Sequence, residues 1–231
     1  MLRIFLITLA VTFLWAPSEA DAGDERQGIH ATAEMAQPLM PGMVAPSFSV
    51  RDAHGKNVDF DPASMDRPLV LSFYRGGWCP YCNIHLSEMR HAEKELQDLG
   101  FDVWFLSIDQ PEVLRPSLDE PDISYTLLSD SGLQATRAFG IAFRVDDETH
   151  QRYLTHDIDL EAASGESHHV LPVPSTFIIG KDGKINFAYS NPKYTVRLHP
   201  DVLLAAARAY TRDEDERLRR MRKAQREAAK Q

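Results

Sequence analysis

Two cysteines are the residues of this chain whose type and spacing most directly suggest chemistry. They are the only two among 231 residues, and they lie three positions apart in the segment Trp78-Cys79-Pro80-Tyr81-Cys82. A thiolate is a nucleophile, and a second thiol nearby can attack a mixed disulfide that the first has formed. A purely stabilising disulfide is less favoured, because the entropic gain of a cross-link grows with the loop that it closes. The spacing therefore predicts a redox-active pair, Cys79 and Cys82.

Metal binding is an alternative use of such a pair. A structural zinc site normally needs four ligands, often two C-x-x-C pairs or one pair with two spaced histidines. The chain has no second pair, but His85 and the neighbours His168 and His169 could complete a site. A metal-binding or metal-delivery module therefore stays open as a second alternative, whereas the redox interpretation needs no metal ion and no organic cofactor.

The elements around the cysteines predict how the pair is presented. An apolar run at 69–74 reads as a buried strand, and Arg75 with two glycines after it indicates a turn. Pro80 suits the first position of a helix, whose apolar face then follows at helical spacing through Cys82, Leu86, Met89, Ala92, Leu96 and Leu99. Both sulfurs should thus lie at a helix N-terminus, where free N–H groups and the helix dipole favour a thiolate.

The N-terminus predicts export. Arg3 precedes an apolar stretch at 4–16 that is too short to span a bilayer, and small residues lead up to Ala22. We expect a signal peptide over 1–22, cleaved after Ala22, or after Ala20 as the second choice. The mature protein would then be secreted or periplasmic, with no membrane span, in a compartment where disulfides persist. The formal net charge of −9 disfavours nucleic acid as a partner.

The rest of the chain reads as one domain with appendages. Residues 23–43 are small and polar and predict a flexible lead-in; the domain itself is expected over 44–211, and its segment from about 144 to 170 is a polar insertion that borders the site. The densely charged residues 212–231 predict a solvated helical tail. Strands are expected at 47–50 and 57–60 as a hairpin, at 69–74 and 102–108 in a β-α-β unit, at 124–128, and at 175–179 and 184–189 as a second hairpin. The sheet should therefore be mixed.

This order of motifs resembles the thioredoxin-like superfamily, and within it the peroxiredoxin-like branch of the alkyl hydroperoxide reductase and thiol-specific antioxidant family, also called redoxins. The resemblance is carried by 45–48 with the hairpin after it, by Phe73 to Cys82, by the strand entry at 171–177, and by Tyr194 to Arg197. It implies an α/β thioredoxin-like fold, with a mixed central sheet flanked by helices, an N-terminal β-hairpin and a C-terminal charged helical extension.

The family resemblance assigns the two cysteines in two ways. By the thioredoxin pattern, Cys79 is the nucleophile and Cys82 the resolving thiol. By the peroxiredoxin pattern, Cys82 occupies the peroxidatic position, while Arg75 and Cys79 stand where that family has a proline and a threonine. Arg75 or Arg197 could replace the arginine that peroxiredoxins use to stabilise the developing alkoxide.

Other residues of the site are implied by the same resemblance. Val173 and Pro174 are similar to the cis-proline entry of a thioredoxin strand, which offers backbone hydrogen bonds to a bound substrate chain. Trp78, Pro80 and Tyr81 would border the sulfurs. The chain is therefore interpreted as a thiol-disulfide oxidoreductase and antioxidant protein that acts on protein thiols and disulfides or on small peroxides, with a separate partner resetting the pair. A peroxiredoxin-type thiol peroxidase with Cys82 peroxidatic is the first alternative.

Overall fold

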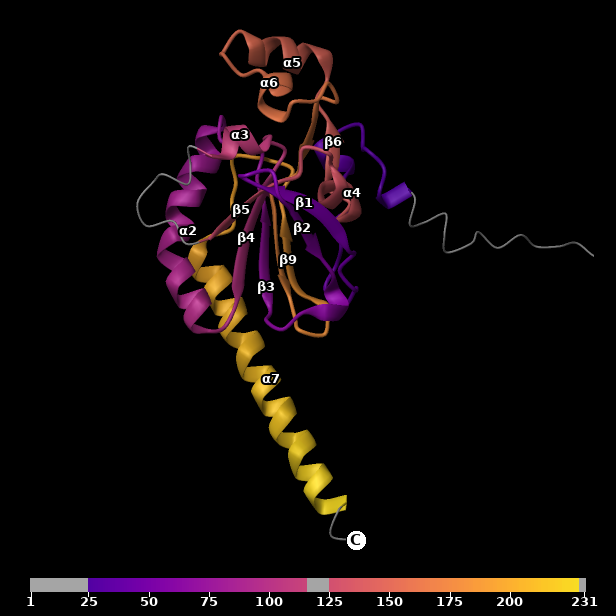
Figure 1. Ribbon diagram of the computed structural model, residues 1–231, viewed down its shortest axis with the longest axis vertical. Coiled ribbons are helices and arrows are strands. Elements are labelled where there is room, and N and C mark those ends of the chain that lie inside the picture. The colour runs from indigo at the N-terminus through magenta and orange to yellow at the C-terminus, as the bar shows by residue number, and fades with distance from the viewer. Residues whose placement is uncertain (1–24, 116–124, 229–231) are drawn as a thin grey trace, which may run out of the picture.

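A mixed seven-stranded sheet forms the centre of the molecule (Figure 1), with the strand order β2-β1-β5-β4-β3-β8-β9. The computed structural model describes residues 25–115 and 125–228. Strand β4 pairs in parallel with β3 and β5, and the other pairs are antiparallel. The strands are β1 (Phe48–Asp52), β2 (Asn57–Phe60), β3 (Leu69–Phe73), β4 (Asp102–Ser107), β5 (Thr126–Ser129), β8 (Ser175–Ile179) and β9 (Ile185–Ser190). Both predicted hairpins, the β-α-β unit and the mixed sheet are confirmed.

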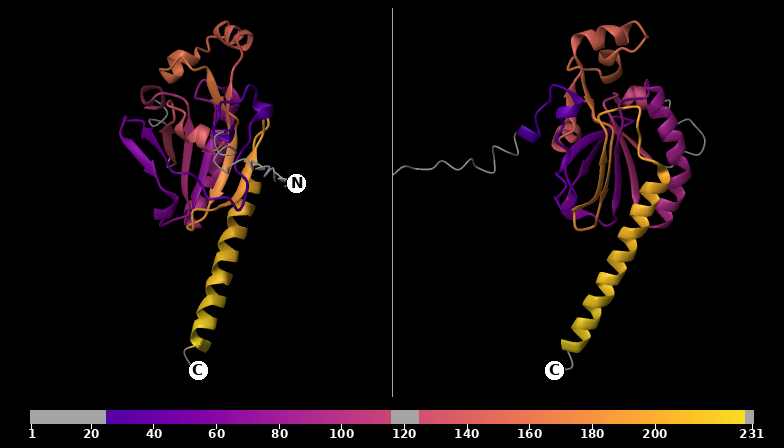
Figure 2. Two further views of the ribbon diagram at one scale, coloured as in Figure 1. Left: turned by 90° about the vertical axis from the view of Figure 1, so that its right-hand side faces the viewer. Right: turned by 180° about the vertical axis from the view of Figure 1, so that it is seen from behind.

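Helices cover both faces of this sheet (Figure 2). On one face α2 (Pro80–Asp98) lies beside the first half of α7 (Pro200–Ala228), and their apolar side chains share a buried cluster with β3, β4 and β8. The other face is covered by α4 (Gln134–Ala138) and the N-terminal segment. Three shorter helical elements are α3 (Pro111–Leu114) and the 3-10 turns η1 (Ala33–Met35) and η2 (Pro62–Ser64).

The C-terminal half of α7 projects away from the domain (Figures 1 and 2). This agrees with the predicted charged helical extension, although no break separates it from the helix that packs on the sheet. No helix in the described ranges combines the length and the apolar character needed to cross a bilayer.

The segment expected to be a flexible lead-in is instead packed on the domain from Gly28 onward. His30 pairs with Phe143 in an isolated bridge, and the Gln37 N–H donates to the Gly140 carbonyl at 2.9 Å. Leu39 is buried in the main core. Sequence patterns did not reveal this order because the segment has no apolar period; its contacts are backbone hydrogen bonds to a distant part of the chain.

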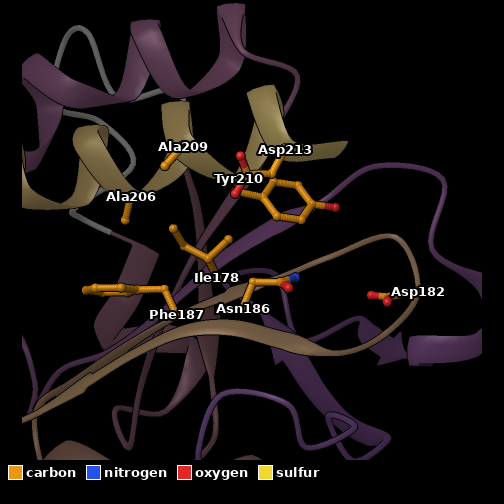
Figure 3. A pocket seen from close by; sticks show the side chains of 8 residues that line it. All are labelled: Ile178, Asp182, Asn186, Phe187, Ala206, Ala209, Tyr210 and Asp213. Carbon is orange, nitrogen blue, oxygen red and sulfur yellow. The ribbon is translucent and has the colours of Figure 1, made fainter. Parts of the chain in front are cut away.

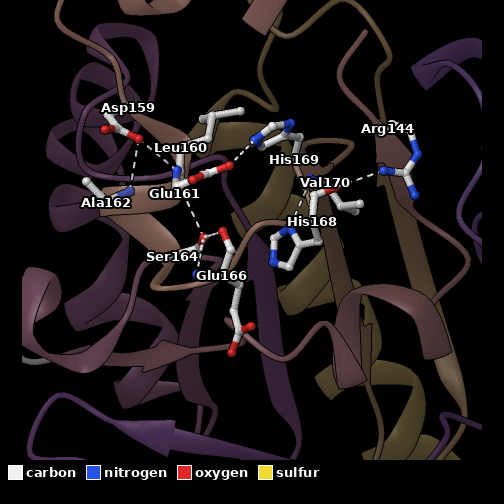
Figure 4. Close-up of polar contacts among 10 residues, drawn as sticks. All are labelled: Arg144, Asp159, Leu160, Glu161, Ala162, Ser164, Glu166, His168, His169 and Val170. Atoms are coloured by element: carbon white, nitrogen blue, oxygen red, sulfur yellow. Dashed lines mark hydrogen bonds and ion pairs between the residues drawn. The ribbon is translucent and has the colours of Figure 1, made fainter. Parts of the chain in front are cut away.

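The polar insertion folds into two short helices, α5 (Asp147–Leu154) and α6 (Leu160–Ser164), between the paired strands β6 (Ala142–Arg144) and β7 (Val170–Pro172). Asp146 and Asp159 accept backbone N–H groups of the first turns of α5 and α6. In the segment that leads from α6 to β7 (Figure 4), His169 contacts Glu161 at 2.8 Å and the His168 carbonyl accepts a hydrogen bond from Arg144 at 3.1 Å. The insertion is therefore an ordered part of the fold, at one end of the sheet (Figure 1).

A tight loop joins β3 to α2 and carries the cysteines. The Gly77 N–H donates to Oδ2 of the buried Asp109 at 2.7 Å, which ties the loop to the end of β4. Gly76 has a φ of +155°, and a Cβ added there would lie 2.3 Å from Nε1 of Trp78 and 2.7 Å from Oδ1 of Asp109. Only glycine leaves room for the indole at this point.

The substitution Gly76→Ala should therefore lower the free energy of unfolding by about 1–3 kcal/mol, because the indole of Trp78 must move to admit the methyl group. Gly77→Ala is the matched control, since its Cβ would meet Asp109 at an ordinary 3.8 Å. Urea denaturation followed by tryptophan fluorescence measures both changes. Equal losses in the two variants would show that this close approach does not constrain the loop.

Candidate active site

Both cysteines are buried thiols at the start of α2. Cys79 precedes the first helical residue and Cys82 lies in the first turn, and their residues are 2% and 0% exposed. The N–H groups of Cys82 and Asn83 donate to the Cys79 carbonyl at 2.9 and 3.1 Å, so the first turn fixes the spacing of the pair. The predicted placement at a helix N-terminus is confirmed, but the sulfurs are less accessible than a simple exchange motif would require.

The pKa values of the two thiols are shifted in opposite directions. A hydrogen bond from the Cys82 thiol, together with the positive charges of Arg75 and Arg197, lowers the pKa of Cys79 to about 6, although burial opposes this shift. The same hydrogen bond, burial and the neighbouring Cys79 charge raise the pKa of Cys82. These opposite shifts favour the thiolate on Cys79 and the protonated thiol on Cys82.

Arg197 reaches the pair from the connection between β9 and α7. Its Nη2 donates to the sulfur of Cys82 at 3.2 Å. The connection is held along α2 because Nε2 of the buried His85 lies 3.1 Å from the Leu198 carbonyl. Burial lowers the pKa of His85 to about 4, so its neutral ring donates this hydrogen bond. Arg197 is thus anchored next to the first turn of α2 and is not a surface ion-pair residue.

Arg75 is the second cation of the site and is 3% exposed. The carbon of its guanidinium lies 4.2 Å from the ring of Tyr194, 5.0 Å from that of Trp78 and 5.4 Å from that of Tyr153. Its Nη2 also donates to the Tyr153 hydroxyl. Trp78 belongs to the cysteine loop, Tyr153 to the insertion and Tyr194 to the β9–α7 connection. The insertion therefore borders the site, as predicted.

Asp109 is a buried carboxyl group directly beneath the cysteine loop. Burial raises its pKa to about 6, against hydrogen bonds from the Gly77 N–H and the Ser107 hydroxyl. It also opposes a negative charge on Cys79. The site therefore holds one acid near Cys79 in addition to the two guanidinium groups.

Val173 and Pro174 do not form the predicted cis-proline entry. The described residues contain no cis peptide bond. The Val173 N–H donates to the Ile141 carbonyl at 2.8 Å, and the Pro174 carbonyl accepts from the Asn191 N–H at 3.1 Å. These backbone groups are occupied by the fold itself, so they are not free to bind a substrate chain, and the trans form is the usual state of such a bond.

The other predicted residues lie where the sequence indicated. Trp78 packs against the cluster that contains both cysteines, Pro80 is the first residue of α2, and Tyr81 is 45% exposed at the rim. A metal site is not supported: within the described ranges no three His, Cys, Asp or Glu side chains are placed to hold an ion. His168, one of the candidate ligands, hydrogen bonds with the Ser131 carbonyl at 3.0 Å.

Three residues of the site were not found from the sequence, namely Asp109, Tyr153 and Tyr194. Asp109 follows a strand that is parallel to the one before the cysteines, and parallel strands end at the same edge of a sheet, so its position was a usable signal. Tyr153 lies in a polar segment with no such landmark.

A hollow of about 360 Å³ between the β8–β9 hairpin and α7 is separate from this site (Figure 3). Ile178 and Phe187 of the strands lie opposite Ala206 of α7, and Asp182 and Asp213 also line the hollow. None of the residues around the thiol pair lines it.

A titration tests the electrostatics of the pair. The ultraviolet absorbance of the thiolate should rise with a midpoint near pH 6 in the reduced protein, because the lowered pKa makes the charged form prevail above that pH. Cys82→Ala should move the midpoint upward, since it removes the thiol that donates to Cys79, and Cys79→Ala should abolish the step. A step that survives Cys79→Ala and disappears in Cys82→Ala would place the charge on Cys82 instead.

Comparisons with known proteins agree with this geometry. The model of the AhpC/TSA family matches residues 41–188. Peroxiredoxin Bcp of Escherichia coli (strain K12) is 30% identical over 167 residues, which is 72% of this chain and 94% of that protein. A putative peroxiredoxin of Mycobacterium tuberculosis is 28% identical over 157 residues, 68% of this chain and 88% of that protein.

Solved structures support the fold. Peroxidoxin BcpB from Mycobacterium tuberculosis superposes with a TM-score of 0.58 at 22% identity, covering 74% of this chain and 97% of that one. Peroxiredoxin Q of Xanthomonas campestris gives 0.55 at 18% identity, with 76% and 98% coverage. With the family model spanning the sheet and the buried thiol pair, the chain belongs to the AhpC/TSA family and is a thiol-dependent oxidoreductase with the thioredoxin-like fold.

Proposed function

We propose that the protein is a thiol peroxidase in which Cys79 attacks the peroxide and Cys82 closes an intramolecular disulfide. The observation that carries this proposal is the burial of both thiols next to two guanidinium groups. The peroxiredoxins among its relatives support the same reaction class.

Burial favours a small substrate over a protein disulfide. At 2% and 0% exposure, neither sulfur can be approached by the disulfide of a folded partner without rearrangement of the first turn of α2. A hydroperoxide group is small enough to enter such a site. Its reaction also develops negative charge on the leaving oxygen, which Arg75 and Arg197 would stabilise where water is excluded.

Cys79 is the better nucleophile of the two. Its lowered pKa favours the thiolate, and it directly precedes the free N–H end of α2. Cys82 holds a proton and contacts Arg197. The guanidinium would stabilise the Cys82 thiolate as it forms during the second step.

The proposed reaction has two steps. The Cys79 thiolate bonds to one peroxide oxygen, the O–O bond breaks, and the departing oxygen takes a proton to leave as an alcohol or water. Cys79 is then a sulfenic acid. The Cys82 sulfur attacks it, losing its own proton, and hydroxide leaves as water when the disulfide forms. The peroxide has taken two electrons from the pair, and two electrons from a thiol donor restore both thiols.

Single-turnover reactions of Cys79→Ser and Cys82→Ser with hydrogen peroxide test this assignment. In Cys82→Ser, whose hydroxyl can still donate to Cys79, a sulfenic acid should accumulate on Cys79 and be trapped by dimedone, as mass spectrometry of peptides would show. Wild type should instead lose two hydrogens to a disulfide, with little adduct. Cys79→Ser should react no faster than a free thiol.

Two results would contradict the proposal. A dimedone adduct on Cys82 in Cys79→Ser, formed at the wild-type rate, would make Cys82 the peroxidatic residue. A slow reaction of wild type and both variants alike would remove the peroxidase function.

Disulfide exchange with proteins is the second candidate function, and one observation favours it. Four large apolar side chains near the thiols are exposed, at 40–58%: Tyr81, Ile84, Tyr194 and Val196. The rings of Tyr81 and Tyr194 pack edge to face, with their centroids 5.8 Å apart. Such a rim could receive a partner protein. Fast reduction of a protein disulfide, combined with a slow peroxide reaction, would favour this function.

We further propose that the protein is exported and that residues 1–22 are removed. The proposal rests on the charged, apolar and small-residue regions of the N-terminus. Intact mass measurement of protein recovered from the periplasmic or culture fraction of the producing cells should give a chain beginning at Gly23. Recovery of the uncleaved chain from the cytoplasm would contradict export.

A further inference from the structure

We propose that Tyr153 is a positioning residue, supplied by the insertion, that holds the Arg75 guanidinium in place beside the thiol pair. The inference deepens the proposed peroxidase function, because it concerns the same site. By this proposal the insertion contributes a functional residue, Tyr153, to the active site, although Tyr153 lies outside the cysteine motif.

Arg75 needs such a partner because it is buried without an anionic side chain beside it. At 3% exposure it forms no ion pair with a carboxylate among the described residues, and its Nε has no hydrogen-bond partner there. A buried guanidinium is costly unless it is paired or hydrogen bonded. Its positive charge lowers the pKa of Cys79 and so stabilises a thiolate there.

The aromatic rings around Arg75 attract it but do not fix the direction of its N–H groups. Trp78, Tyr153 and Tyr194 offer ring faces, and the attraction between a cation and a ring depends weakly on rotation of the guanidinium. A hydrogen bond is directional. The Tyr153 hydroxyl is the one side-chain acceptor that Arg75 has in the described part of the chain, and it therefore sets the orientation.

Tyr153 is itself held firmly enough to serve this purpose. It lies in the last turn of α5, and its carbonyl accepts the N–H groups of His156 and Ile158 at 2.9 and 3.0 Å. Its ring packs against Trp78 with centroids 6.0 Å apart. The contacts of the returning segment (Figure 4), among them His169 with Glu161, tie the insertion to the domain.

The groups that interact electrostatically with Cys79 define what a change at Tyr153 can alter. They are Cys82, Arg75, Arg197 and Asp109. Of these, only Arg75 contacts Tyr153. Loss of the phenol hydroxyl should therefore act on the thiolate through Arg75 alone.

The test substitution is Tyr153→Phe, which keeps the ring against Trp78 and Arg75 and removes the hydroxyl. The midpoint of the thiolate titration should rise, and below that midpoint the rate constant with hydrogen peroxide should fall by about tenfold, the scale of one hydrogen bond to a charged group. The tryptophan emission of the reduced protein should stay unchanged, because the ring that packs against Trp78 is retained. Tyr189→Phe is the matched control, since its hydroxyl also accepts a hydrogen bond, from Asn191 at 3.2 Å, on β9.

A double-mutant cycle separates positioning from a merely structural role. In an Arg75→Gln background, Tyr153→Phe should change neither the titration midpoint nor the peroxide rate further. An unchanged midpoint in Tyr153→Phe alone, or an equal shift with and without Arg75, would overturn the proposal. If wild type reacts with peroxide only as a free thiol does, the proposed function fails, but the titration still decides the role of Tyr153.

Discussion

The active site depends on the placement of two positively charged arginine side chains next to two buried cysteine sulfurs. Arg75 and Arg197 approach the cysteine pair from two directions, and neither is neutralised by a carboxylate in an ion pair within the described residues. Charges attract far more strongly in such a site than in water. Both cations lower the pKa of Cys79 and so stabilise a thiolate there. The attraction between the guanidinium groups and the thiolate therefore affects both the reactivity of the pair and the stability of its surroundings.

Several parts of the fold converge to maintain this arrangement. The start of α2 sets the spacing of the cysteines, Asp109 at the end of β4 holds the preceding loop, and His85 fixes the connection that carries Arg197. The insertion contributes Tyr153, one of the three rings around Arg75. These elements are far apart in the chain, but parallel strands bring their ends to the same edge of the sheet. The site is thus a product of the topology as much as of the cysteine motif.

Much of this could be predicted from local patterns. The apolar run before the cysteines, Pro80 at the helix start and the turn residues of both hairpins each determine their element over a few residues, and all were confirmed. The surroundings of Arg75 could not be predicted in this way. Arginine is usually exposed, and its burial here depends on rings from two distant segments. The packing of the segment before Val44 likewise depends on backbone partners that no local pattern identifies.

The most direct test of the account is the rate constant of the fully reduced wild-type protein with hydrogen peroxide, followed by stopped-flow fluorescence of Trp78 at neutral pH. Its reference is a free thiol with the same pKa as Cys79, so that thiolate content alone cannot explain a difference. We expect the protein to react at least about a hundredfold faster, since donors aimed at the leaving oxygen in a water-excluded site contribute factors of that size or more. A rate equal to that of the free thiol would contradict the claim that the two guanidinium groups form a peroxide-reducing site.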